Sequence, residues 1–417
     1  QDRVAAALAF HLDPADWYQS TSSPPLRLDA YEEFRRGVDL LVEAETWGES
    51  ANHFLKAWAL DSTYLDAGIM AYIYLDQATQ LGQGDRTFER DSVLDRLGQF
   101  QDQMTRVQQF QLNIARYTFS WNLEAALREA RAASEYFPLE MAYDLGHKAN
   151  FLNRATEALE AFQKWDLGDG QFLDGFIRGW PYYFHQYAEA LHRLGRHREE
   201  LEIILEGRRR YPDHADLRDR ELVARIGLGQ TDQITDLIAE VRSEEGGNAV
   251  RLIARELFAH GLDETAVEVL EEEVQRFGMD PYYFDSPSRQ ATVLHYLQRE
   301  DEAHALFEEA SAADPENPWL FAWVGITAPL VGDTAQAWEV DQRLADWPRE
   351  GIPRPYNFPF VRAQIQTNLG NRAEAVRLLE DAYFQGGRLF YFPDHTMFDL
   401  LPLQGFPPYD DLMKPKG

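Results

Sequence analysis

Short turns recur at nearly regular intervals along most of this chain. Each is a pair such as Gly195-Arg196 or Gly332-Asp333, flanked by segments whose apolar residues have helical spacing. The turns begin at residues 121, 153, 195, 229, 261, 298, 332 and 370, so that neighbouring turns lie 32 to 42 residues apart. Periods of about 20–50 residues are typical of arrays in which one helical or mixed unit stacks on the next. The 417 residues are therefore expected to form a repeat array.

The residues around the turns identify the type of repeat. After the turn at residue 298 come Ala303, Phe307 and Ala310, with Pro315 closing the unit, and other turns are followed by the same small–large–small pattern. A small residue also lies seven positions before most turns: Gly146, Ala188, Ala254, Ala291, Gly325 and Ala363. Small residues at these positions let two helices approach closely. The pattern indicates helix–turn–helix units of the tetratricopeptide (TPR) type, which are about 34 residues long.

The predicted fold is an all-α solenoid of about ten antiparallel helix pairs in a right-handed superhelix. The second helices are expected near residues 47–60, 86–100, 122–137, 154–165, 197–210, 231–244, 263–277, 300–313, 334–346 and 372–386. The expected organisation is an N-terminal strap or loop at 1–28, helix pairs at 29–165, a glycine-rich linker at 166–180, helix pairs at 181–387 and an aromatic, proline-rich cap at 388–417.

Charge and composition exclude several functions. With 40 Lys+Arg and 70 Asp+Glu the net charge is −30, which repels phosphate backbones, so we expect no nucleic-acid partner. Cysteine is absent, which excludes disulfides and thiolate sites. The longest uncharged stretch, residues 317–332, is too short to span a bilayer, so we expect no membrane insertion of this chain.

The start of the chain, Gln1-Asp2-Arg3-Val4, lacks Met and an apolar leader. It fits either a mature N-terminus left by signal cleavage or a piece of a longer parent protein. A periplasmic or other extracytoplasmic location is favoured over the cytoplasm.

Several distinctive stretches carry a resemblance to known proteins. They are Gly179-Trp180-Pro181-Tyr182-Tyr183-Phe184, residues 188–195, Glu199-Glu200-Leu201, residues 208–212 and, at the end, residues 399–403, 406–409 and 412–417. Together they resemble bacterial TPR regions that lie C-terminal to serine/threonine kinase, adenylate cyclase or winged-helix regulator domains, over roughly residues 29–417. The resemblance implies a docking or sensing region without the catalytic domain, since the glycine-rich loop and the catalytic motifs of a kinase are missing.

Positions two, five, nine and twelve of each first helix are expected to face a concave groove. On that basis we predict partner-binding residues at Tyr143, His147, Tyr182, His185, Glu189, His192, Arg251, Arg255, Phe258, His295, Phe360 and Gln364.

Two features of these residues have alternative interpretations. His185, Glu189 and His192 share a helix face, but the two histidines would lie about 10 Å apart along the axis, so no metal site is predicted. Arg251 and Arg255 fit either salt bridges to a neighbouring helix or a clamp for a partner's carboxylate.

The sequence favours a non-enzymatic scaffold that binds a protein or peptide through its groove or an aromatic edge, without cofactors. The alternative is a sensor whose groove closes on a small ligand or peptide. No nucleophile or acid/base signature appears, so no catalytic residue is predicted. The identity of the partner and the oligomeric state stay open, including association between copies of the chain.

Overall fold

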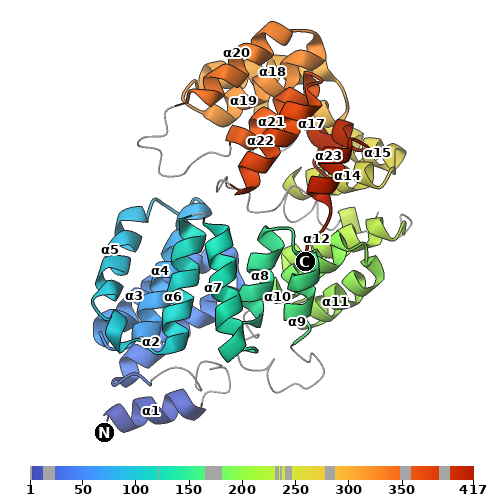
Figure 1. Ribbon diagram of the computed structural model, residues 1–417. Coiled ribbons are helices and arrows are strands. Elements are labelled where there is room, and N and C mark those ends of the chain that lie inside the picture. The colour runs from blue at the N-terminus through green and yellow to red at the C-terminus, as the bar shows by residue number, and fades with distance from the viewer. Residues whose placement is uncertain are drawn as a thin grey trace. The chain divides into compact units, whose positions relative to one another are not determined.

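The computed structural model describes residues 2–12, 24–120, 122–164, 181–230, 234, 237–239, 247–277, 287–347, 358–384 and 395–417. These residues are mostly helical and contain no strand (Figure 1). In the same residues, no helix combines the length and the apolar character that crossing a membrane requires.

Contacts divide the chain into two compact units, Gln1–Ala190 and Leu191–Gly417. The helices that begin in the first unit are α1 (Asp2–Leu12), α2 (Leu28–Asp39), α3 (Trp47–Leu60), α4 (Leu65–Gln80), α5 (Thr87–Gly98), α6 (Arg106–Phe119), α7 (Leu123–Tyr136), α8 (Ala142–Phe151), α9 (Ala155–Phe162) and α10 (Pro181–Arg193). The boundary between the units falls inside α10.

The second unit continues the series. Its helices are α11 (His197–Arg210), α12 (Ala215–Gly227), α14 (Gly247–Ala259), α15 (Asp263–Gln275), α17 (Pro287–Tyr296), α18 (Glu300–Ala313), α19 (Pro318–Thr327), α20 (Thr334–Ala345), α21 (Phe358–Asn368), α22 (Arg372–Phe384), the 3-10 helix η8 (Phe398–Leu403) and α23 (Pro407–Met413).

Within each unit, every helix packs mainly on its neighbours in sequence. Partners such as α8 and α9 or α21 and α22 form a pair, and a second helix such as α7 or α18 contacts the first helix of the next pair. First helices also contact each other, as α4 contacts α6 and α19 contacts α21. This is the packing of a TPR-like all-α solenoid, so the predicted fold class is confirmed. Most of the predicted second helix at 231–244 lies outside the described residues.

The turns and the small residues have the structural roles that the pattern predicts. Gly195 and Gly332 have φ values of 66° and 91°, a left-handed conformation that lets the chain reverse between the helices of a pair. Gly146 faces Phe162 so closely that a Cβ atom would lie 2.5 Å from Cζ of the ring. Glycine at this position therefore sets how closely α8 and α9 pack.

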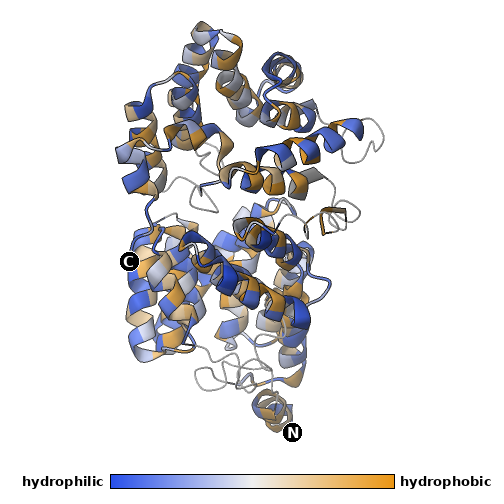
Figure 2. Cartoon of the chain, turned by 90° about the vertical axis from the view of Figure 1, so that its right-hand side faces the viewer, coloured by the Kyte–Doolittle hydropathy of each residue, from blue (hydrophilic) through white to orange (hydrophobic). Residues whose placement is uncertain are grey.

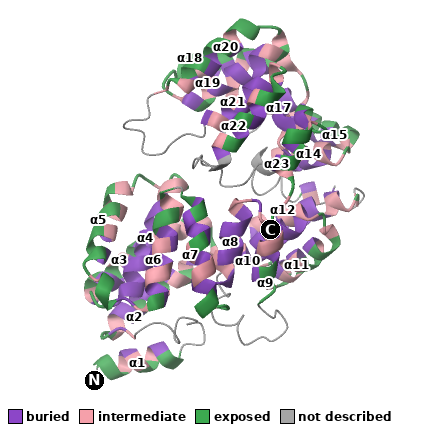
Figure 3. Cartoon of the chain, in the orientation of Figure 1, coloured by how far each residue is buried: buried purple, intermediate pink, exposed green. Residues whose placement is uncertain are grey.

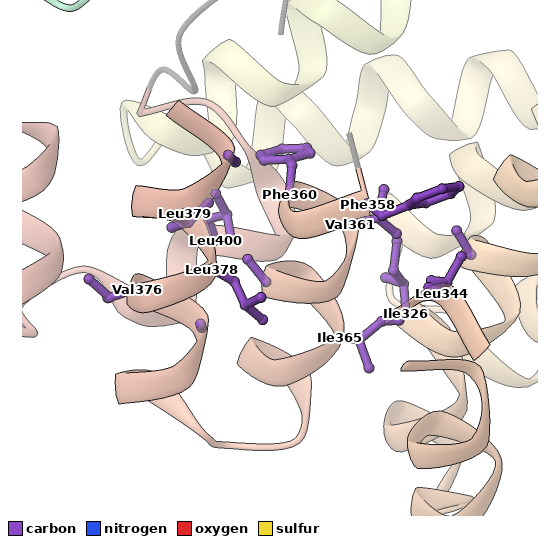
Figure 4. Close-up of a cluster of buried hydrophobic side chains, with 14 of the residues drawn as sticks. Ile326, Leu344, Phe358, Phe360, Val361, Ile365, Val376, Leu378, Leu379 and Leu400 are labelled. Atoms are coloured by element: carbon purple, nitrogen blue, oxygen red, sulfur yellow. The ribbon is translucent and has the colours of Figure 1, made fainter. Parts of the chain in front are cut away.

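The helices bury one face each. Figure 2 shows apolar residues alternating with hydrophilic ones around the helices, and Figure 3 shows buried positions where neighbouring helices meet. A large buried cluster of the second unit joins α19–α22 to the C-terminal segment through Leu400, Leu403, Tyr409 and Leu412 (Figure 4). The aromatic C-terminus is therefore part of the core of this unit.

The N-terminal stretch differs from the expectation. Residues 1–28 were expected to be a strap or loop, but α1 occupies residues 2–12, with Ala6 and Phe10 buried and in contact with α2. Its apolar residues form a helical stripe that becomes recognisable as structural only once α2 covers it. The linker expected at 166–180 lies outside the described residues, as do residues 385–394 of the expected cap.

Candidate functional site

The first helices of the first unit bring five of the predicted residues to one face. Tyr143 and His147 lie one turn apart on α8, with ring centroids 5.4 Å from each other, and Tyr182, His185 and Glu189 come from α10. Glu189 is buried.

Two groups that the sequence did not single out lie among them. Tyr74 of α4 is buried, which raises the pKa of its hydroxyl well above the usual value, and the neighbouring Tyr143 and Tyr182 add to the shift. Lys148 is also buried, and this burial lowers the pKa of its amine to about 8, although Asp144 partly offsets the effect. Neither Tyr74 nor Lys148 belongs to the predicted groove residues. Their burial, which marks them as unusual, is visible only in the structure.

In the second unit, the same inner face of the first helices carries a segment of the chain itself. Residues 395–404, which we call the tail segment, include η8, and η8 contacts both α14 and α21. The tail segment thus lies on the predicted groove residues of this unit, and its contacts define the site.

Arg255 of α14 holds the backbone at the start of the tail segment. Its Nε donates a hydrogen bond to the carbonyl oxygen of Thr396 at 3.1 Å, and its Nη2 donates to the Thr396 hydroxyl at 2.9 Å. Arg255 therefore binds a main-chain group and a hydroxyl of the tail segment. Arg251, one turn away, is largely buried, and this burial lowers the pKa of its guanidinium.

Phe398 of the tail segment occupies an aromatic pocket. Its ring centroid lies 5.4 Å from that of Phe258, 4.9 Å from Tyr296 and 5.3 Å from His295. These are normal separations for attractive aromatic pairs. Two of the three rings, Phe258 and His295, are residues that the sequence predicted for partner binding.

Asp399 follows directly and is held by side chains from two first helices. Nε2 of His295 lies 2.9 Å from Oδ1 of Asp399, and Nε2 of Gln364 donates to Oδ2 at 3.0 Å. Nδ1 of His295 lies 2.9 Å from Glu300. Burial opposes a charge on His295, but the two carboxylates outweigh it and raise the pKa of His295 to about 10. His295 is therefore a cation that binds the tail segment at neutral pH.

Phe360 lies in the buried cluster of α19–α23, with 7 % of its surface exposed. The sequence predicted it as a groove residue. It belongs to the same hydrophobic core as Leu400 and Leu403 of the tail segment (Figure 4).

At its N-terminal end, the tail segment meets a group of histidines and carboxylates. Nε2 of His192 lies 3.3 Å from Oε1 of Glu256, and Nε2 of His260 lies 3.0 Å from the same oxygen. His395 of the tail segment reaches that oxygen at 3.5 Å. The sequence identified only His192, because the other residues come from different repeats or from the tail. The one local signal was Glu256 and His260, four residues apart at the C-terminal end of α14.

Comparison with known proteins gives only distant structural similarity. No protein-family model matches the chain, and no curated protein matches it either. Among solved structures, a tetratricopeptide repeat protein from Parabacteroides merdae ATCC 43184 is 11 % identical, with a TM-score of 0.35, and the match covers 59 % of this chain and 92 % of that chain. The structure of Naa15/Naa10 bound to HypK-THB is 13 % identical, with a TM-score of 0.24, over 85 % of this chain and 68 % of that chain. The P58(IPK) TPR domain is 12 % identical, with a TM-score of 0.22, over 92 % of this chain and 99 % of that chain.

Proposed function

We propose that this protein is a non-enzymatic scaffold that binds a peptide segment of a partner protein along the inner face of its first helices. One observation carries the proposal: the second unit already holds an irregular peptide in this place, namely its own tail segment. Arg255 binds the main chain of the tail segment, and an aromatic pocket binds the ring of Phe398. His295 and Gln364 bind the carboxylate of Asp399.

These contacts define the chemistry of a suitable partner. A hydroxyl residue would meet Arg255, an aromatic residue two positions later would fill the pocket, and an acidic residue directly after it would pair with His295. Aromatic anchors in a pocket and charge-assisted hydrogen bonds are the contacts that contribute most to peptide affinity. The partner segment is therefore expected to contain a Thr/Ser-x-aromatic-acidic sequence and to compete with the tail segment.

Competition with a tethered segment lowers the apparent affinity for an external peptide. A short tether gives the tail segment an effective concentration in about the millimolar range, so an external peptide must bind more tightly or the tail segment must be released. The alternative of a groove that closes on a solute would gain weight from a hinge at 166–179, and this stretch lies outside the described residues.

The test uses the full chain with two side-chain anchors of the tail segment removed. The double variant Phe398→Ala with Asp399→Asn removes the aromatic anchor and the carboxylate, while Leu400 and Leu403 keep the rest of η8 packed. A fluorescent peptide that copies residues 395–406 should bind this variant more tightly than wild type, as measured by fluorescence anisotropy. The matched control is the same peptide with its Phe and Asp replaced by Ala and Asn.

A third variant locates the binding. Adding Arg255→Ala to the double variant should weaken peptide binding by about 10- to 100-fold, since a charged hydrogen-bond donor contributes about 1.5–3 kcal/mol. Equal affinity of both peptides for the folded double variant would refute the proposal.

A further inference from the structure

The proposed function leaves unexplained a polar group inside the second unit. It consists of His192, His197, Glu200, Glu256, His260 and His395. Four of the eleven histidines of the chain meet here with two buried carboxylates. Among the described residues of this unit, no other group brings so many metal-binding side chains together. We propose that His192, Glu256, His260 and His395 bind one zinc ion.

The distances between the ligand atoms fit a single ion. The Nε2 atoms of His192, His260 and His395 lie 3.3, 3.0 and 3.5 Å from Oε1 of Glu256, and all four ligand atoms lie within 4.8 Å of one another. Zinc bound tetrahedrally at about 2.0–2.1 Å separates its ligand atoms by about 3.3 Å. Small side-chain movements are therefore enough to place an ion between the four atoms.

Glu200 orients the central histidine for this role. Its carboxylate lies 3.0 Å from Nδ1 of His192, and this carboxylate has no exposed surface. A proton on Nδ1 leaves the lone pair on Nε2, which faces Glu256 and the other two imidazoles. A carboxylate behind a metal-binding histidine is a common feature of zinc sites, because it fixes the tautomer and makes the ligand more basic.

The charges of the group also favour a divalent cation. Glu200 and Glu256 are both fully buried and together carry two negative charges. A buried charge must be paired, and one Zn²⁺ with neutral imidazoles balances the two carboxylates.

The ligand set indicates which metal binds. Three imidazole nitrogens and one carboxylate oxygen suit Zn²⁺, whereas Ca²⁺ and Mg²⁺ prefer sets of oxygen ligands. Four protein ligands correspond to a closed, structural zinc site rather than to a catalytic one. The side chains of His260 and His395 are 22 % and 37 % exposed, which gives the ion a path from solvent.

The ion would fasten the tail segment. His192 comes from α10, Glu256 from α14, and His260 directly follows α14. The fourth ligand, His395, directly precedes Thr396, to which Arg255 donates hydrogen bonds. Zinc would thus connect the tail segment to the first helices at the end opposite the apolar residues Leu400 and Leu403. The zinc site does not depend on peptide binding, so the two proposals fail separately.

The experiment measures the zinc content of the untagged full-length protein. The protein is treated with a chelator, incubated with excess ZnCl₂ and dialysed against buffers of graded free zinc concentration. Elemental mass spectrometry then gives both the number of zinc ions per chain and the zinc affinity. We expect one zinc per wild-type chain and a loss of about 10-fold or more in zinc affinity for His260→Ala and for His395→Ala. Glu200→Gln should weaken zinc binding by about 10–100-fold, because it removes the orienting carboxylate.

Two variants serve as controls. His197→Gln changes a histidine that also touches Glu200 but is not a proposed ligand, and His11→Ala changes an exposed histidine of α1. Both should keep one zinc per chain. His395 lies in a turn, so its variant should keep the wild-type circular dichroism, and hydrogen exchange of residues 395–404 should rise when zinc is removed from wild type.

The opposite results would overturn the proposal. A wild-type chain that retains no stoichiometric zinc would show that the group is an ion-paired histidine–carboxylate cluster. Zinc binding that survives His260→Ala and His395→Ala but is lost in His197→Gln would place the ion on His192, His197 and Glu200 instead.

Discussion

The inner faces of the two units are built from the same repeat but carry different chemistry. In the first unit, α4, α8 and α10 bring together tyrosines and a buried lysine, Lys148, whose amine has a lowered pKa. In the second unit, α14, α17 and α21 hold the tail segment through Arg255, His295 and Gln364. The repeat therefore determines which positions face inward, whereas the individual side chains determine what is bound there.

The tail segment is the clearest difference between the two units. Truncating Leu400, which anchors this segment in the core, should therefore have the largest effect on stability. Leu400 is fully buried in the cluster of α19–α23. Leu400→Ala should lower the free energy of unfolding of the second unit by about 2–5 kcal/mol, as buried leucine truncations do. Hydrogen exchange measured helix by helix should show lost protection in α21 and α22.

The matched control lies in the first unit. Leu75 of α4 is equally buried, and Leu75→Ala should lower protection in α4 and α6. The same loss of protection in both units for either variant would contradict the division into two units.

His295 should make the second unit sensitive to alkaline pH. Its pKa of about 10 lies above the unfolded value of about 6.5, so the stabilisation is complete below about pH 6.5 and is lost as the pH rises towards 10. His295→Gln should cost about 2–4 kcal/mol at pH 6, because it breaks a buried ion pair. Denaturant unfolding at several pH values measures the difference in free energy of unfolding between the wild type and His295→Gln. This difference should decrease from pH 6.5 to 10. A constant difference would contradict the assignment.

Lys148 should give the first unit the opposite pH dependence. Its pKa is lowered to about 8, so the unfolded chain binds the proton more tightly between about pH 8 and 10.5, and stability rises with pH in that interval. Lys148→Met should therefore stabilise the protein by about 1–3 kcal/mol at pH 7, with a smaller gain at pH 10. Thermal unfolding at both pH values measures the change, and a loss of stability at pH 7 would show that Asp144 compensates the burial of the amine in full.

The smallest expected effect concerns the repeat itself. Gly146→Ala places a methyl group against the Phe162 ring and should destabilise the first unit by about 1–2 kcal/mol. Gly98→Ala near the end of α5 is the control, since a Cβ there meets no atom within 4 Å and should be neutral or slightly stabilising. Equal effects of the two variants would show that the close approach at Gly146 does not limit packing.

Much of the fold could be predicted from the sequence because its signals are local. The turn residues and the small residues of each helix pair lie within a single repeat. From them the sequence predicted second helices such as α11 and α18 at their observed bounds. Helix α1 was missed because its short apolar stripe has no paired repeat to identify it. That the predicted residues face a groove stays a prediction. In the structure Phe360 lies in the core, and the others in the second unit bind the tail segment or lie beside it.

The sequence by itself determined the repeat type and the turn positions, because helix periodicity and turn conformation depend on neighbouring residues. Only the tertiary structure decided that the tail segment crosses α14, α17 and α21. It alone brought His395 to His192, Glu256 and His260, residues from separate parts of the chain. Such contacts depend on how successive repeats stack, and no periodic pattern in the sequence encodes which distant side chains then meet.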